Sequence, residues 1–165
     1  MASDGEHIGD FQRRKRYLPH WEGPGEAYFL TFALRRPPIV NLTDERYARL
    51  VVDALRFFDG TRYDLYDYTV MPDHVHLIIK PVVSDNQAES LSRITHSLKS
   101  WLAHRINELA GREGDVWGKG SYDHVLRNLK DYEEKGAYIL DNARRKGLVA
   151  DPAKWPWWGI GSAGR

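Results

Sequence analysis

Hydrophobic residues along the chain form short apolar runs that alternate with longer amphipathic stretches. The runs 27–36, 62–70 and 74–80 are rich in Val, Ile, Leu, Phe and Tyr, as β-strands are. The short Met-Pro-Asp link between the second and third runs predicts a hairpin. A fourth strand is predicted within 116–127, where two glycines leave its bounds open.

Three longer stretches repeat apolar residues with the helical period. The predicted helices cover residues 43 to about 60, 89–110 and 129–146. Thr43 is the expected N-cap of the first helix, while Gly111 and Gly147 are expected to stop the other two. The order β-α-β-β-α-β, followed by a helix, predicts an α+β fold of ferredoxin-like type. Its antiparallel sheet would carry helices on one face and leave the other face open for chemistry, with the last helix, which carries Tyr138, beside that open face.

No internal repeat or long linker divides the sequence. We therefore expect a single domain over 1–165, with a basic N-terminal arm (about 1–22) and a Trp-rich C-terminal tail (about 150–165). The chain has no cysteine, which excludes disulfides, thiolate metal sites and cysteine nucleophiles. It also has no apolar run of membrane-spanning length and no signal segment, so we expect a cytoplasmic protein with no membrane partner.

Charge is nearly balanced overall but clustered locally. The net charge of +1 and the sequence pI of about 8.0 do not by themselves indicate a nucleic-acid-binding protein. Basic residues gather at 13–16 and again at 144–146. These clusters predict either positive patches or a solvated arm and an ordinary basic helix C-terminus.

Two histidines stand two positions apart on the strand 74–80. Side chains alternate along a strand, so His74 and His76 share one face, whereas Val75, Leu77 and Ile79 face the helices. The histidine Cα atoms are then about 6–7 Å apart, close enough for both rings to bind one divalent ion. A pair of partly buried, hydrogen-bonded histidines explains the same pattern.

A second pair of polar residues lies on the last predicted helix. Tyr138 and Asn142 are four residues apart, so they share one helical face. Local packing is the alternative interpretation.

Aromatic side chains near both ends of the chain could offer stacking surfaces for unpaired bases. They are His20, Trp21, Trp155, Trp157 and Trp158. The tail tryptophans would also serve to clamp the tail onto the domain.

Five segments together resemble the REP-associated tyrosine transposases of the HUH superfamily. They are MPDHVHLIIKP, SLKSWLAHRIN, VWGKGSYDHVLR, YILDNARRKGLV and WPWW, in that order. The N-terminal stretch RRKRYLPHWEGPGEAYFLTFAL is also similar to this family. The resemblance covers most of the chain.

The resemblance implies a catalytic site and a substrate. His74 and His76 would be metal ligands, Asn142 the third ligand and Tyr138 the nucleophile. Two neutral nitrogens and one amide oxygen would leave the charge of a bound ion undiminished, which suits Mg²⁺ or Mn²⁺, bound mainly when DNA is present. The family usually has proline after that asparagine and a small residue before the glycine, where this chain has Ala143 and Lys146.

The implied partner is single-stranded or hairpin DNA, and the sequence leaves open whether the protein is a monomer or a homodimer. Candidate DNA contacts are Arg13, Arg14, Lys15, Arg16, His20, Trp21, His124, Arg127, Arg144 and Arg145. His124 is a candidate for substrate contact or proton shuttling, and Asp73 is expected to serve the turn after Pro72. Two alternatives are a non-catalytic binder of DNA hairpins that keeps the fold, and a metal enzyme acting on small phosphoesters.

Overall fold

A computed structural model describes residues 25–164. Its elements are β1 (Ala27–Ala33), α2 (Glu45–Phe57), β2 (Tyr63–Val70), β3 (His74–Pro81), β4 (Val83–Ser84), β5 (Gln87–Ala88), α3 (Leu91–Ala110), β6 (Tyr122–Leu126), α4 (Leu129–Arg145), η1 (Pro152–Lys154), β7 (Trp158–Ile160) and η2 (Ser162–Gly164). The predicted order of four strands and three helices is confirmed, and the short strands β4, β5 and β7 were not predicted. β1 and β6 are shorter than the runs predicted for them, and Gly118 and Gly120 lie in the loop before β6.

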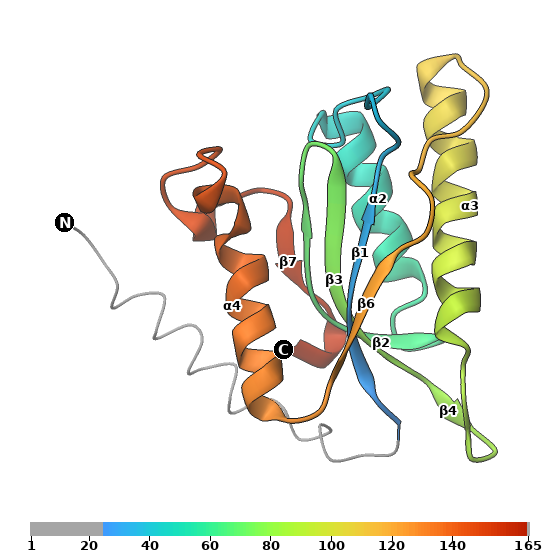
Figure 1. The fold of residues 1–165 in the computed structure, drawn as a ribbon, viewed down its shortest axis with the longest axis vertical. Helices are drawn as coiled ribbons and strands as arrows, with labels where there is room; N and C mark the ends of the chain where they lie inside the picture. Colours follow the sequence, from blue (N-terminus) through green and yellow to red (C-terminus); the bar gives the residue numbers. More distant parts are fainter. Residues whose placement is uncertain (1–24, 165) are drawn as a thin grey trace.

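The main sheet is antiparallel and has the strand order β6-β1-β3-β2-β7 (Figure 1). The four strands β6, β1, β3 and β2 have the arrangement of a ferredoxin-like fold, and β7 adds an edge strand beside β2. β3 lies at the centre and pairs with both β1 and β2. The two histidines of β3 are therefore supported by backbone hydrogen bonds on both sides.

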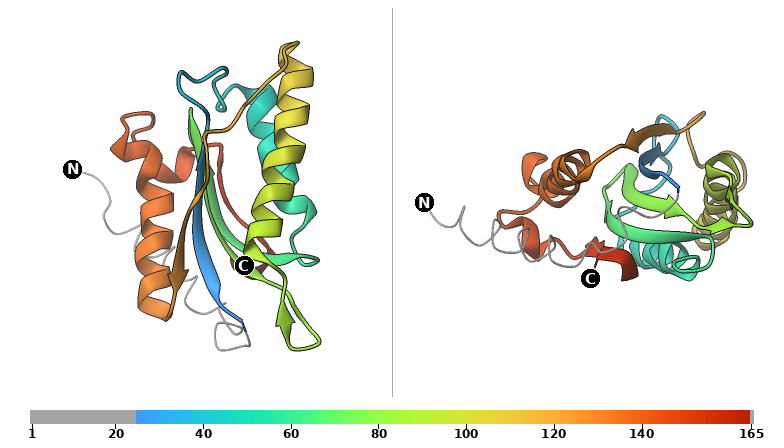
Figure 2. Two further views of the ribbon diagram at one scale, coloured as in Figure 1. Left: turned by 45° about the vertical axis from the view of Figure 1, so that its right-hand side comes forward. Right: turned by 90° about the horizontal axis from the view of Figure 1, so that it is seen from below.

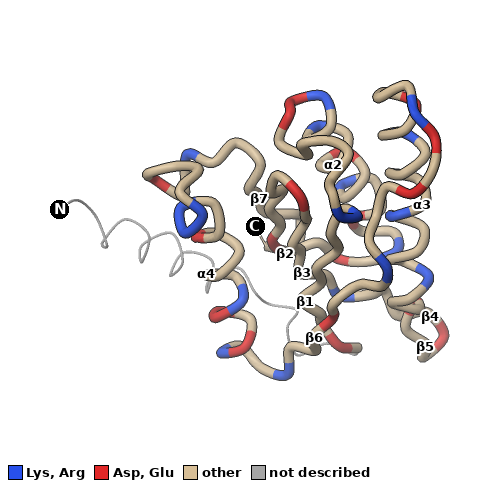
Figure 3. Tube along the Cα trace, turned by 45° about the horizontal axis from the view of Figure 1, so that its top comes forward, with Lys and Arg blue, Asp and Glu red and all other residues tan. Residues whose placement is uncertain are grey.

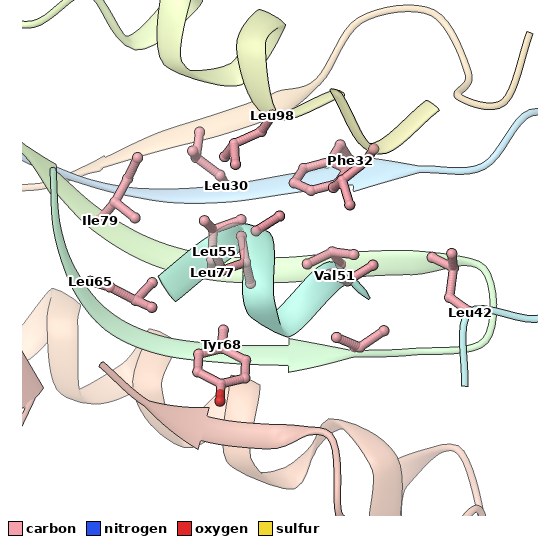
Figure 4. Packing of buried hydrophobic residues seen from close by; sticks show 14 of the residues in the cluster. Leu30, Phe32, Leu42, Val51, Leu55, Leu65, Tyr68, Leu77, Ile79 and Leu98 are labelled. Carbon is pink, nitrogen blue, oxygen red and sulfur yellow. The ribbon is translucent and has the colours of Figure 1, made fainter. Parts of the chain in front are cut away.

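Helices cover both faces of this sheet. α2 and α3 lie on one face, and α4 lies on the other (Figure 2). Val75, Leu77 and Ile79 are fully buried in the core formed with α2 and α3, which confirms the predicted face. Figure 4 shows Leu77 and Ile79 packed with Leu55 of α2.

A second, smaller cluster joins the opposite face to α4. Ile78 of β3 and Phe29 of β1 pack there with Tyr132 and Ile139 of α4. The side of the sheet that carries the histidines is thus partly covered by the helix that follows β6. The helix predicted to bear Tyr138 is held against that face by apolar contacts.

Polar side chains determine where the helices begin. The expected cap Thr43 is wrong by one residue, because Asp44 accepts the hydrogen bond from the Arg46 amide and caps α2. The Thr43 hydroxyl instead donates to the side chain of Asn41. Asn128 caps α4 through the Asp131 amide. Gly111 ends α3 in the left-handed conformation, as predicted.

The C-terminal tail is part of the fold over the described residues. The Trp155 indole N–H donates to the Val70 carbonyl at 3.1 Å, and Trp157 packs beside the larger core. Trp158 in β7 packs beside the smaller cluster. A Cβ at Gly161 would overlap the Leu65 carbonyl, so the absence of a side chain lets this segment lie directly on β2.

The N-terminal arm lies outside the described residues. Within 25–164, no helix has both the length and the apolar character required to span a bilayer.

Candidate functional site

The two histidines of β3 meet ring to ring. The Nε2 atoms of His74 and His76 are 3.0 Å apart, and the ring centroids are 4.5 Å apart. His76 is buried, whereas the His74 side chain keeps an exposed fraction of 18%. The pair therefore lies at the edge of the solvent-accessible surface, with one ring inside and one partly outside.

Each histidine has a hydrogen-bond partner on its other nitrogen. The Asp73 carboxylate lies 2.7 Å from Nδ1 of His74, and this bond holds the pKa of Asp73 below its ordinary value. The Thr31 hydroxyl on β1 lies 2.6 Å from Nδ1 of His76. An ionised carboxylate only accepts hydrogen bonds, so His74 donates from Nδ1 and a neutral ring has its lone pair on Nε2.

The Thr31 hydroxyl can form a hydrogen bond with either neutral tautomer of His76. It accepts from Nδ1 when Nε2 of His76 carries a lone pair, and it donates to Nδ1 when Nε2 carries a proton. In the second case the Nε2 proton bonds to His74, which accounts for the 3.0 Å separation without an ion. In the first case both Nε2 lone pairs are free for one metal ion. Histidine ligands of metal ions commonly donate a hydrogen bond from their other ring nitrogen in this way.

His76 is neutral at physiological pH. Burial, the neighbouring His74 and the Lys135 ammonium lower the pKa of His76 to about 3. Only the neutral ring can donate an electron pair to a metal ion. The neutral His76 ring could therefore bind a metal ion through a nitrogen that carries a lone pair.

Tyr138 on α4 completes an aromatic cluster around His76. Its ring centroid lies 5.4 Å from that of His76 and 6.0 Å from that of Phe29, and both contacts are edge-on. Phe29 itself is stacked on His76 at 5.3 Å. With 36% of its surface exposed, Tyr138 can meet a substrate. By contrast, the β2 tyrosines are all buried: Tyr63, Tyr66 and Tyr68.

A residue in a β-bulge of β2 forms a hydrogen bond with the helix that carries Tyr138. The register of β2 against β3 shifts between Leu65 and Tyr68, so that the normal alternation is broken there. Asp67, fully buried within this bulge, accepts a 2.7 Å hydrogen bond from the Tyr132 hydroxyl of α4. Tyr132 precedes Tyr138 on the same helix, so this bond limits how far Tyr138 can move from β3.

The side-chain oxygen of Asn142 has no hydrogen-bond partner within residues 25–164. This atom, Oδ1, is also buried, and burial without a hydrogen bond is a costly state for an amide oxygen. Asn142 follows Tyr138 by one helical turn and therefore lies on the same side of α4. A cation beside this oxygen would remove the cost.

The spacing of the two histidine nitrogens is compatible with their binding one divalent cation. Two neighbouring ligands of an octahedral ion, each about 2.1 Å from the metal, lie roughly 3 Å apart, as the two Nε2 atoms do. No group of three His, Cys, Asp or Glu side chains in residues 25–164 is arranged to hold a metal ion, so the third protein ligand would be the Asn142 oxygen.

Several cationic side chains lie near this group. Lys135 Nζ lies 4.9 Å from the Phe29 ring centroid, and Arg145 lies 5.5 Å from that of Tyr138. The blue segments along α4 in Figure 3 mark its Lys and Arg positions. Beside His74 is a cleft of about 530 Å³ with Arg36 and Lys146 in its wall.

The remaining predicted DNA contacts are distributed unevenly. His124 on β6 is exposed and pairs directly with Phe29 in the sheet register, which places it near the cluster. Arg127 is exposed before α4, while Arg144 is bound to Asp141. The other predicted contacts lie outside the described residues: Arg13, Arg14, Lys15, Arg16, His20 and Trp21.

A family model described as "Transposase IS200 like" matches residues 31–126, more than half of the chain. The chain belongs to this transposase family. A REP-associated tyrosine transposase of Escherichia coli (strain K12) is 26% identical over 133 residues, which are 81% of this chain and 75% of that protein. A putative REP-associated tyrosine transposase of Haemophilus influenzae is 29% identical over 140 residues, 81% of this chain and 78% of that protein.

A solved structure of the REP-associated tyrosine transposase bound to a REP hairpin shares this fold. Its TM-score is 0.66 at 23% identity, and the match covers 81% of this chain and 76% of that one. The resemblance found in the sequence of this transposase is thus confirmed, as is the ferredoxin-like fold class.

Four residues that support the predicted site were not predicted from the sequence: Phe29, Thr31, Asp67 and Lys135. Phe29 and Thr31 alternate on one face of a predicted strand, but their contact with His76 depends on strand register. Lys135 had a local signal, because it precedes Tyr138 by three residues and so shares its helical face.

Proposed function

We propose that this transposase cleaves and rejoins single-stranded DNA next to a hairpin, in a divalent-metal-dependent reaction with Tyr138 as the nucleophile. The observation that carries the proposal is the meeting of Tyr138 with His76, while Asn142 of the same helix keeps a buried oxygen without a partner among the described residues. One chain supplies all four side chains of the proposed site. Hairpin DNA is proposed as substrate because a relative of the same fold is bound to a REP hairpin.

His74, His76 and Asn142 would hold Mg²⁺ or Mn²⁺. When bound, such an ion withdraws electron density from a phosphate oxygen and stabilises charge on the leaving oxygen. Asp73 and Thr31 would hold the imidazoles in place from behind. All three protein ligands are neutral, so the ion would keep its full charge for the phosphate.

Tyr138 would attack the phosphorus in line. The new bond joins its phenolic oxygen to phosphorus, and the bond between phosphorus and the 3′ oxygen breaks. The phenolic proton passes to solvent, and the departing 3′ oxygen takes up a proton there. One phosphodiester replaces another, so a 3′ hydroxyl can reverse the step and join strands. His124, the register partner of Phe29, would contact the DNA or transfer a proton.

The experiment is incubation with labelled single-stranded hairpins from the DNA flanking the protein's own gene, followed by denaturing electrophoresis. We expect a covalent protein–DNA adduct and a free 3′ end in Mg²⁺ or Mn²⁺, and neither in excess chelator. Tight hairpin binding without adduct in either metal would favour the non-catalytic hairpin binder. Sedimentation of the protein with and without hairpin distinguishes a monomer from a homodimer.

A further inference from the structure

Two cations of α4 lie against the ring of Tyr138. Lys135 Nζ is 5.9 Å from its centroid, and Arg145 Cζ is 5.5 Å from it. Lys135 precedes the tyrosine by three residues and Arg145 follows it by seven, so all three share one stripe of the helix. The proposed nucleophile is therefore bordered along the helix by positive charge.

Neither cation is neutralised within residues 25–164. No carboxylate of this part of the chain forms an ion pair with Lys135 or Arg145, although α4 carries several acids. Their neighbours on the same helix do pair: Lys130 approaches Glu134, and Arg144 binds Asp141. The two cations beside Tyr138 therefore keep their charge available for an anionic ligand.

The position of Lys135 is unfavourable for a bare metal site. It is half-buried against Phe29, and that ring is stacked on His76. An ammonium group there repels a divalent ion at the histidines, because like charges interact strongly where water is partly excluded. An anion bound between the Lys135 ammonium and the divalent ion would attract both cations, and a phosphodiester carries the required negative charge.

We propose that Lys135 and Arg145 form a phosphate-binding pair that holds the scissile phosphodiester of the DNA against Tyr138. This inference rests on the proposed function and names the part of the substrate that this pair contacts. Before cleavage the pair would fix the phosphate in reach of the phenolic oxygen. After cleavage the same pair would bind the single negative charge of the tyrosine-linked phosphodiester.

The binding test removes one negative charge from the DNA and one positive charge from the protein. Hairpins carry a single uncharged methylphosphonate at successive linkages of the unpaired flank, and Tyr138→Phe protein prevents cleavage. At one linkage we expect methylphosphonate to weaken binding roughly three- to tenfold. Adding Lys135→Gln should weaken binding of ordinary DNA by a similar factor and have almost no further effect on that methylphosphonate hairpin. Arg145→Gln should behave likewise at the same linkage.

Lys130→Gln, on the same helix but away from Tyr138, is the matched control, and its effect should be the same for every hairpin. Thermal melting of each variant shows whether weaker binding arises at the phosphate or from unfolding. If Lys135→Gln weakens binding equally at all linkages, or does not weaken it at all, the phosphate-binding pair is overturned.

The rate test uses otherwise unchanged protein in Mg²⁺ or Mn²⁺. Lys135→Gln should slow single-turnover adduct formation roughly 10- to 100-fold, and Lys135→Arg should recover part of the rate. Adduct formation at the wild-type rate by Lys135→Gln overturns the pair. The wild-type protein could form no adduct while Lys135→Gln and methylphosphonate still have non-additive effects on binding at one linkage. In that case the proposed function fails and the phosphate-binding pair stands.

Discussion

The ring of Tyr138 on α4 lies 5.4 Å from the ring of His76 on β3, at an interplanar angle of 71°. This contact joins the two halves of the proposed site, which are far apart in the sequence. It depends on the packing of α4 against the sheet and on the strand register that places His76 beside Thr31. Changes that disturb either support should therefore affect the proposed chemistry.

Metal binding should depend on ligands from both β3 and α4. We expect His74→Ala and Asn142→Leu each to lower the affinity for Mn²⁺ about tenfold or more in the presence of hairpin DNA, because each removes one donor. Electron paramagnetic resonance of Mn²⁺ with Tyr138→Phe protein and hairpin measures this directly. His104→Ala, an exposed position on α3, is the control. Unchanged affinity in both ligand variants would contradict the assignment.

The hydrogen bond between Tyr132 and Asp67 should stabilise the position of α4. Tyr132→Phe removes the donor from a buried carboxylate, and we expect the free energy of unfolding to fall by about 1–3 kcal/mol. Adduct formation should also slow, since α4 carries Tyr138. Chemical denaturation measures the first effect. Tyr122→Phe, which alters an exposed tyrosine, should leave stability nearly unchanged; equal destabilisation of the two variants would refute the anchoring role.

Stability should fall in mild acid because of His76. Its pKa is about 3 in the folded protein and 6.5 ordinarily, so between these values the unfolded chain binds a proton that the folded chain does not. The free energy of unfolding should therefore decrease as pH falls below 6.5, by up to about 1.4 kcal/mol per pH unit. Above pH 6.5 this contribution stays constant.

Urea denaturation in chelator between pH 4.5 and 7.5 tests this effect. His76→Gln should flatten the slope, and His104→Gln should retain it. A slope in His76→Gln as steep as in the unchanged protein would assign the acid sensitivity to other groups.

The basic arm should contribute to DNA affinity through phosphate contacts. Replacing Arg13, Arg14, Lys15 and Arg16 with Gln should weaken hairpin binding and reduce its dependence on salt, by about 0.7–0.9 units of log–log slope for each phosphate that the arm neutralises. Binding isotherms at several salt concentrations measure the slope. Neutralising Arg93 and Arg105 on α3, across the sheet from the histidines, is the control. An unchanged slope in the arm variant would contradict a DNA-binding role.

The periodicity of the sequence was sufficient to predict the main strands and helices. Alternation along β3 correctly separated Val75 and Leu77 from the two histidines, because one face of a central strand must be buried against helices. The edge strand β7 was not predicted. It is only three residues long and includes a glycine, and its position depends on pairing with β2, where Gly159 and Gly161 lie close to Tyr68 and Leu65.

The supports of the site required the three-dimensional structure. Thr31 reaches His76 through the pairing of β1 with β3, and a register shift of one residue would turn it away. Asp67 reaches Tyr132 because of a bulge, which interrupts the alternation used to assign faces. By contrast, Tyr138 and Asn142 could be assigned to one helical face from their spacing alone.

The most direct test of the proposed mechanism is whether Tyr138→Phe protein forms a covalent adduct. This change keeps the ring that contacts His76 and Phe29 and removes only the oxygen proposed to attack. Hairpin affinity should stay within a few-fold of the unchanged protein, while cleavage and the adduct should disappear. A denaturant-resistant protein–DNA species formed by the Phe variant in Mg²⁺ or Mn²⁺ would contradict the assignment of Tyr138 as the nucleophile.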